Sequence, residues 1–340
     1  MNTEANIANF TCTFRVNGEA EPMLKYFEKI LWPAFNHKTL IRTTNKGLTR
    51  YHLTDVQLIN LNGTIALIGK HVKRTIITLS PDYNIKDGFF GDEEKKPSAP
   101  YSTFIILLDN HRIIYYKNKP GAPNLKSFES TAKRILDEFI RLKHKELKEN
   151  LENNNRIYNG KKYKYIEDFR NEVLFSEYPL ANLNIVPIES ETLVEEAFKR
   201  IHKISSVKFR FFIPNNEPVD YNNFFASCTQ IVKETGSKSM TQNLTSPEKV
   251  DVVENAIKTS GGKADYVLKA VDEDKEGFTI TPDSVSETIP LSVEEDETIE
   301  NQSKKVYNHL KDNNAINTIS EENKKLFKSF KPKILSLFTK

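Results

Sequence analysis

The sequence predicts an α+β protein of two modules, each a mostly antiparallel sheet with flanking helices on one side. Two observations predict this class. Runs rich in β-branched and aromatic residues occur in pairs joined by short turns, and amphipathic helical segments lie between those pairs. The 340 residues suffice for about two domains, each with its own core. Hydrophobic residues make up 38% and charged residues 28%, a balance typical of globular chains.

The first half of the chain carries the clearest local signals. Asn62-Gly63 separates two strand-like runs, and this dipeptide favours a hairpin because both positions tolerate a positive φ. Pro22 suits the first turn of a helix in which apolar residues recur at helical spacing. The expected elements are a strand at residues 10–16, a helix at 22–32, paired strands at 49–61 and 64–79, paired strands at 102–108 and 112–116, and a long amphipathic helix at 127–148.

The second half again mixes helix and strand. Ser190 is a candidate cap for a helix, and Pro214 is expected to end a strand. The expected elements are strands at residues 183–188 and 207–213, helices at 192–201 and 221–233, a hairpin of residues 264–271 and 277–281, and a helix at 298–313.

Composition sets the expected module boundaries. Residues 149–165 are polar and rich in Asn and Lys, which predicts a boundary or linker. Residues 272–300 hold eleven acids against Lys275 alone, a local charge of −10 in a chain of net +3, and are expected to form a turn and a flexible acidic stretch. The predicted layout is an N-terminal module (1–150), a linker (151–165), a C-terminal module that includes the acidic segment (166–318) and a basic amphipathic tail (319–340).

Cysteine use and the N-terminal sequence predict a cytoplasmic protein. Cys12 and Cys228 are far apart, so both thiols are expected to be buried apolar residues, and a disulfide framework or cysteine-rich zinc site is not expected. The N-terminus lacks a basic region followed by an apolar run, and no apolar stretch approaches the roughly 20 residues that span a bilayer. The 38 lysines against 11 arginines suggest an AT-rich genome, such as that of a low-GC bacterium or one of its mobile elements.

Residues 80–100 spell the residue order of the PD…(D/E)xK metal-dependent nucleases. Pro81-Asp82 precedes Glu94 and Lys96, so two carboxylates would hold a divalent metal while the lysine polarises the attacking water. That chemistry needs rigid neighbouring strands. Gly88, Gly91, Pro97 and Pro100 instead predict a mobile, solvated loop, which is the preferred interpretation. No metal or cofactor is expected.

Two histidines offer a metal-free alternative. His52 and His71 fall on neighbouring expected strands, where one imidazole would take a 2′-hydroxyl proton of RNA while the other protonates the leaving oxygen. Counted from the turn, the two positions are not directly opposite, so ordinary hydrogen-bonded histidines are preferred. The acidic turn at Asp272 does not match the EF-hand pattern, and no phosphate loop or nucleophile elbow is present.

Basic residues concentrate on the first expected hairpin and on one strand of the second half. Basic strands with nearby aromatic side chains are typical of a nucleic-acid-binding sheet, which would bring the two groups onto one continuous surface. A solvated polar face is the alternative, because no RNP-type aromatic motif is present. The candidate nucleic-acid-binding residues are Arg50, Lys70, Lys73, Arg74, Lys208 and Arg210.

Residues 324–340 carry six lysines, seven large apolar residues and no acid. Such a segment either docks on an acidic membrane surface or a partner, or folds back to complete the core. Pro332 is expected to interrupt a continuous helix. The residues assigned to partner or membrane contact are Lys324, Lys325, Phe327, Lys328, Phe330 and Lys331.

The sequence therefore favours a non-enzymatic binding protein that is prokaryotic or encoded by a mobile element. We expect it to contact nucleic acid through its basic strands or to act in a protein assembly, and the inferred origin suggests phage defence as the setting. The alternatives are a nuclease, through either candidate set, and a scaffold recruited to a membrane by the basic tail. No known family is recognised from its motifs.

Overall fold

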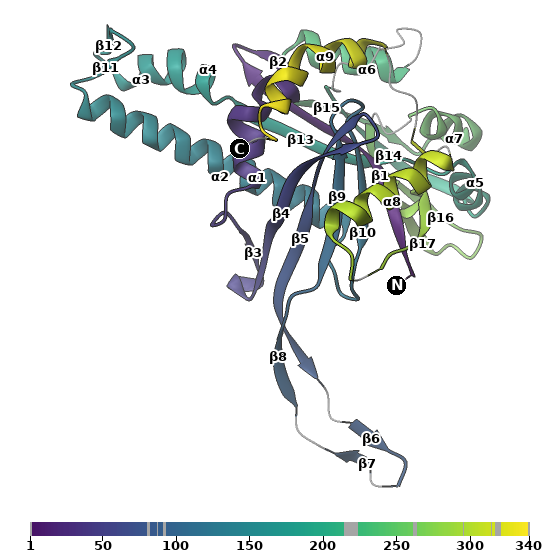
Figure 1. Ribbon diagram of the computed structural model, residues 1–340. Helices are drawn as coiled ribbons and strands as arrows, with labels where there is room; N and C mark the ends of the chain where they lie inside the picture. Colours follow the sequence, from purple (N-terminus) through teal and green to yellow (C-terminus); the bar gives the residue numbers. More distant parts are fainter. Residues whose placement is uncertain are drawn as a thin grey trace.

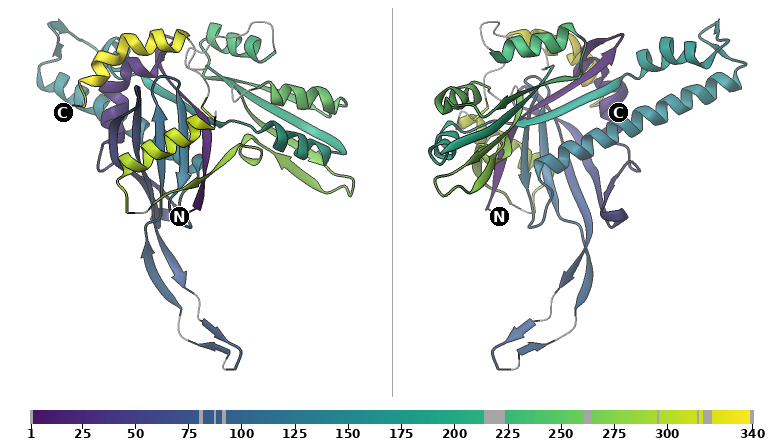
Figure 2. Two further views of the ribbon diagram at one scale, coloured as in Figure 1. Left: turned by 45° about the vertical axis from the view of Figure 1, so that its right-hand side comes forward. Right: turned by 180° about the vertical axis from the view of Figure 1, so that it is seen from behind.

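The computed structural model describes residues 2–79, 82–86, 88–90, 93–213, 224–260, 264–294, 296–313, 315–316 and 321–338. The protein has one large curled antiparallel sheet and a smaller antiparallel sheet beside it, with helices packed on both (Figure 1). A narrow two-stranded arm projects from the large sheet, away from the body (Figure 2). The predicted α+β class is confirmed. Among the described residues, no helix is long and apolar enough to cross a membrane.

The large sheet is built from ten strands: β1 Asn2–Val16, β2 Glu19–Pro22, β3 Arg42–Thr44, β4 Thr49–Leu61, β5 Thr64–Leu79, β8 Glu94–Ser98, β9 Tyr101–Leu107, β10 Arg112–Lys117, β13 Leu180–Pro187 and β18 Thr288–Ser292. Its main path runs β13-β1-β10-β9-β5-β4-β3. Both predicted hairpins of the first half are present, β4 with β5 and β9 with β10. The turn between β4 and β5 has a positive φ at Asn62 and Gly63, as expected.

Helices cover both faces of the large sheet, although the sequence predicts them on one side only. They are α1 Trp32–Phe35, preceded by a 3₁₀ turn (Met23–Tyr26) and a π turn (Phe27–Leu31), α2 Leu125–Asn153, α8 Ile299–Asp312 and α9 Glu321–Leu335. The first core lies between one face and α1, α2 and α9, and the second core lies between the other face and α8. Neighbouring residues of one strand therefore enter different cores, as Ile105 and Ile106 do. A strand buried on both faces shows a continuous apolar run in place of alternation, so periodicity alone does not reveal the second layer.

The smaller sheet has the order β15-β14-β16-β17. Its strands are β14 Lys203–Phe212, β15 Ser239–Thr245, β16 Ala264–Val271 and β17 Gly277–Ile280, and its helices are α5 Glu191–Lys199, α6 Phe224–Glu234 and α7 Val250–Lys258. Val207, Phe209 and Phe211 on β14 face these helices and form a separate core. Ser190 caps α5 as predicted, since its side chain accepts a hydrogen bond from the Leu193 N–H. The described parts of the predicted helices and strands of this half are confirmed.

Strands from the second half of the chain complete the large sheet. β13 pairs with residues 8–15 of β1, and β18 pairs with residues 2–6 of the same strand. The predicted modules 1–150 and 166–318 therefore share this sheet. The expectation of a flexible acidic stretch is wrong for residues 288–292, because Leu291 and nearby Val293 are buried in the second core and hold this segment against β1.

Residues 151–165, the predicted linker, hold the end of α2 and a small hairpin of β11 (Ile157–Tyr158) and β12 (Lys161–Lys162). The chain then forms α3 (Ile166–Phe169), a π turn (Arg170–Leu174) and α4 (Phe175–Glu177). Leu151, Phe169 and Leu174 pack together in a small core at this end of α2, which projects from the body (Figure 1).

Residues 75–98 belong to the projecting arm. The end of β5 pairs with β8, and β6 (Asp82–Asn84) pairs with β7 (Gly88–Phe90) at the tip. The prediction of a loop is therefore wrong for residues 94–98. Pro97 lies within β8. A proline is tolerated there because β8 is an edge strand, so the position where Pro97 lacks an N–H can face the open side of the ribbon.

Candidate interaction sites

The nuclease-like residues lie on the arm. Asp82 begins β6 and Pro81 lies outside the described residues, whereas Glu94 and Lys96 lie on β8. The Lys96 ammonium forms an ion pair of 2.9 Å with the Glu94 carboxylate, and both side chains are exposed. Within the described part of the chain, no group of three or more His, Cys, Asp or Glu residues could hold a metal ion. Lys96 is thus directed at Glu94 rather than toward a metal-bound water.

His52 and His71 lie on opposite faces of the large sheet. His52 is the cross-strand partner of Val72, so His71 points the other way. His71 is fully buried, with Nδ1 3.0 Å from the Tyr115 hydroxyl and Nε2 3.1 Å from the Thr131 hydroxyl. Desolvation lowers the pKa of His71 to about 3. The two imidazoles therefore cannot act on one substrate, and His71 has a structural role.

Arg50 and Arg74 form the most exposed part of the first basic group. They are direct cross-strand partners on β4 and β5, so their side chains share one face of the sheet. Like charges at directly opposed positions repel and destabilise the strand pair. Within the described residues neither arginine forms an ion pair. This pair of guanidinium groups is therefore available to an anionic ligand.

The two lysines of this group are differently placed. Lys70 shares the face of Arg74, but its ammonium forms an ion pair of 2.7 Å with Asp55 and lies 5.2 Å from the centre of the Tyr101 ring. Lys73 lies on the opposite face, where its Nζ is 3.5 Å from the Gly121 carbonyl. Arg50 and Arg74 are thus the members of this group that share one face and form no ion pair with a described residue.

Lys208 and Arg210 lie on the uncovered face of the smaller sheet. Arg210 is the cross-strand partner of Asp265 on β16, and Asp265 is close enough to Lys126 of α2 to affect its pKa. This face is therefore on the α2 side of the molecule. Arg74 lies on the α8 side instead, because it shares a strand face with Ile68 of the second core. Arg50, Lys70 and Arg74 thus point to the side opposite to Lys208 and Arg210, and of the first basic group Lys73 alone lies on the α2 side.

The basic tail folds back onto the first core. Phe327 and Ile334 of α9 are buried there, and Phe330 is partly buried, whereas Lys324, Lys325, Lys328 and Lys331 are exposed. Of the two readings of the tail, completion of the core is the one observed. The helix continues through Pro332, contrary to prediction. Pro332 is solvent-exposed, so water can bind the carbonyl that receives no hydrogen bond because proline lacks an N–H.

The arm exposes large apolar side chains that the sequence analysis does not single out. Ile76, Ile77, Leu79 and Ile85 are all exposed, and Ile85 is 91% exposed. Their β-branched run is the available signal. By itself this run predicts an ordinary buried strand. Only the tertiary structure shows that β5 leaves the body here, so that these side chains are exposed.

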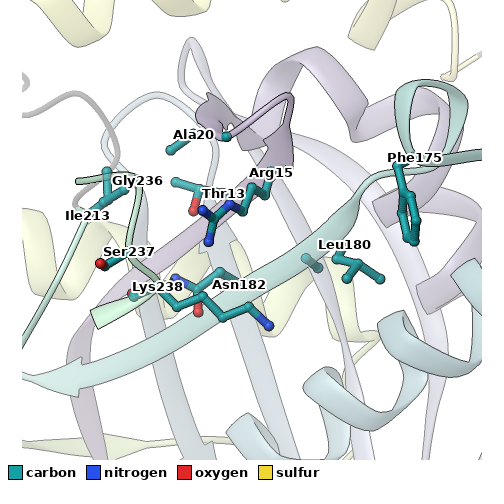
Figure 3. Close-up of a pocket in the computed structure, with 12 residues that line it drawn as sticks. Thr13, Arg15, Ala20, Phe175, Leu180, Asn182, Ile213, Gly236, Ser237 and Lys238 are labelled. Carbon is teal, nitrogen blue, oxygen red and sulfur yellow. Dashed lines mark hydrogen bonds between the residues drawn. The ribbon is translucent and has the colours of Figure 1, made fainter. Parts of the chain in front are cut away.

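A pocket of about 220 Å³ lies where β1, β13 and the start of β15 meet (Figure 3). Arg15 and Lys238 are its charged lining residues. No local sequence pattern predicts this pocket, because its walls come from residues 13–20, 175–182, 213 and 236–238, which are remote from one another in the chain.

Comparison of the chain with known protein families and with curated proteins finds no match.

Proposed function

We propose that the chain is a non-enzymatic binding protein of the cytoplasm that assembles with further copies of itself through its arm. The observation that carries the proposal is the exposure of large apolar side chains on this narrow projection. Ile85 at the tip is 91% exposed and Ile76 is 54% exposed, so the body covers neither. Apolar surface gathered on a projecting segment is typical of a protein contact site.

The arm is also an incomplete sheet. β4 pairs with β5 only as far as Arg74, and beyond it β5 pairs with β8 alone. A two-stranded ribbon has open edges and is marginally stable in water by itself. Ile76 points to one face and Ile77 to the other. A further copy can supply both a strand for an open edge and apolar side chains for a face.

Charge favours a second copy over an unrelated partner. Residues 75–98 carry five acids and three lysines, a net charge of −2, whereas the whole chain has +3, so the rest carries +5. The exposed lysines of α9 form a basic surface on the body. An acidic arm and a basic body on identical molecules are complementary, which favours association and correct register.

Sedimentation velocity of the full chain over a wide concentration range tests this proposal. We expect concentration-dependent association of the natural chain. It should be lost when residues 75–98 are replaced by an Asn-Gly turn and weakened by Ile85→Ser. Leu48→Ser is the matched control, because Leu48 is 65% exposed but lies on the body. A natural chain that stays monomeric throughout, or association that persists without the arm, would contradict the proposal.

Nucleic-acid binding is a second candidate, favoured by the opposed Arg50 and Arg74. Two uncompensated guanidinium groups on one strand pair reduce stability unless an anion lies between them, and the phosphate backbone supplies such anions. In this reading the surface is the α8 side of β4 and β5 alone, without Lys208 and Arg210.

Fluorescence anisotropy with labelled duplex DNA and single-stranded RNA at two salt concentrations tests this second candidate. The double variant Arg50→Gln/Arg74→Gln should weaken binding and reduce its salt dependence, since fewer counterions are released. Lys208→Gln/Arg210→Gln removes the same charge from the opposite side and should leave binding unchanged. Equal effects of the two variants, or no binding at low salt, would exclude the assigned surface.

A further inference from the structure

The pocket of Figure 3 joins the two halves of the chain. One wall is the end of β1 with Thr13 and Arg15, and a second is the start of β13 with Leu180 and Asn182. The turn between α6 and β15 closes it with residues 236–238. The Asn182 side-chain amide donates a hydrogen bond of 3.3 Å to the Lys238 carbonyl, which holds this turn against β13.

The charged residues that line the pocket are basic. Arg15 and Lys238 line it, and none of the described lining residues is acidic. Within the described residues neither cation forms an ion pair. Asp137 of α2 lies near Lys238 but outside the pocket lining. Burial raises the pKa of Asp137 and the Lys238 charge only partly offsets this. Both cations therefore remain available to a ligand.

The backbone holds Arg15 over the pocket. Gly236 has a φ of +61°, and a Cβ there would lie 2.9 Å from the Gly18 carbonyl oxygen and 3.3 Å from Nη2 of Arg15. Only glycine fits this close approach, which keeps the guanidinium between the two turns. Figure 3 shows this guanidinium above the side chains of Asn182 and Lys238. The hydroxyl of Ser237, also in the lining, lies 2.9 Å from the hydroxyl of Thr235.

We propose that this pocket binds a small anion that carries an apolar body, such as an organic carboxylate or a phosphate monoester. Arg15 and Lys238 bind the anionic head, because a guanidinium matches two oxygens of such a group and an ammonium adds a point charge. Phe175, Leu180 and Ile213 in the lining contact the apolar body. A volume of about 220 Å³ is smaller than the pockets of drug-sized ligands, so the ligand is small. The site is independent of the arm and of the assembly proposed above.

Isothermal titration of the full chain with hexanoate and with phenyl phosphate tests the proposal, and the two probes separate a carboxylate from a phosphate ligand. At least one should bind saturably, and Arg15→Gln and Lys238→Gln should each weaken that binding tenfold or more, as expected when a charged hydrogen bond is lost. Lys233→Gln removes an exposed lysine from α6, outside the pocket lining, and should leave the affinity unchanged. Hexanol, which lacks the charge, should not bind.

Several results would overturn the inference. They are no saturable binding of either anion, equal affinity for hexanol, and unchanged affinity in both pocket variants. Circular dichroism and the Tm of each variant show whether it is folded, and a folded variant is expected because Arg15 and Lys238 are exposed. Gly236→Ala gives a second check, since its Cβ displaces Arg15 without removing charge. It should weaken binding as well.

Discussion

At the residue scale, His71 shows how burial decides the role of a titratable side chain. It lies between β5 and α2, with Phe128 packed edge-on against its ring and hydroxyl groups at both nitrogens. Both hydroxyl groups also donate to backbone carbonyls, that of Tyr115 to Pro123 at 2.9 Å and that of Thr131 to Ser127 at 2.8 Å. The ring is shielded from solvent, and this burial disfavours the charged form of His71.

This burial predicts acid sensitivity. The pKa of His71 is about 3 in the folded protein, below its usual value near 6.5, so the unfolded chain takes up the proton first as the pH falls. The contribution of His71 to stability is complete above about pH 6.5 and is lost progressively toward pH 3. Urea unfolding at several pH values gives the free energy of unfolding as a function of pH. Between about pH 3 and 6.5, this free energy should rise less steeply with pH in His71→Gln than in the natural chain, by up to about 1.4 kcal/mol per pH unit. The exposed His309→Gln is the control, and parallel slopes for His71→Gln and the natural chain would refute this role.

Gly69 lies where the structure has no room for a side chain. It lies opposite Phe104 in the pairing of β5 with β9, and a Cβ on it would be 2.5 Å from the Cζ atom of that ring. Phe104 is packed against Phe35 and Phe128, so it cannot move aside without disturbing the first core. Gly69→Ala should lower the free energy of unfolding by about 1–3 kcal/mol.

Gly277→Ala is the matched control, because a Cβ at that position meets no atom within 4 Å. Urea titration measures both variants. Equal stability of the two would show that the strand pair yields at Gly69.

At the scale of elements, α9 shows that one amphipathic pattern serves different partners. Its apolar residues complete the first core while its lysines face water. The sequence pattern is equally compatible with a membrane surface, because both partners require the same alternation of apolar and basic residues. In this protein α9 packs on the body, because it contacts the 3₁₀ and π turns of residues 23–31, which offer it an apolar surface.

Two phenylalanines at this end of the chain test the packing. Phe327 is 7% exposed in the first core, whereas Phe338, just beyond α9, is 41% exposed. Phe327→Ala should destabilise the protein by about 3 kcal/mol through lost burial and a cavity. Phe338→Ala should change stability by about 0.5 kcal/mol or less. Thermal unfolding measures both, and similar effects would mean that α9 is not docked in solution.

At the scale of the whole molecule, the large sheet joins chain segments that are far apart in the sequence. β1 pairs with β13 and β18 from the second half, and α8 and α9 cover opposite faces of the sheet. The first half alone would leave the second core open, with Ile68, Ile105 and Leu107 in water. We therefore expect the halves to depend on each other for folding.

A fragment of residues 1–178 should fail to fold, because it lacks β13, β18, α8 and α9. Trp32, the single tryptophan, lies beside the first core and reports on this loss by its fluorescence. Co-expression of residues 179–340 should restore the native signal. A cooperative unfolding transition of the fragment alone would show instead that the first half is an autonomous domain.

Local signals in the sequence determined most elements of this protein. Asn62-Gly63 sets a hairpin, Ser190 caps α5, and apolar spacing defines α2, because turn geometry, capping and amphipathicity depend on residues close together in the chain. The basic character of Arg50 and Arg74 is likewise evident from the sequence, and so is the burial of Cys12 and Cys228.

Only the tertiary structure decided which surfaces these elements share. It separates Arg74 from Lys208, buries His71 away from His52, carries the apolar end of β5 out of the body and brings Arg15 to Lys238. Each outcome depends on strand pairing or helix docking between residues remote in sequence, and on which face of a strand is covered. Such contacts leave no local pattern, because a buried apolar run has the same composition whether it lies in a sheet or awaits a partner.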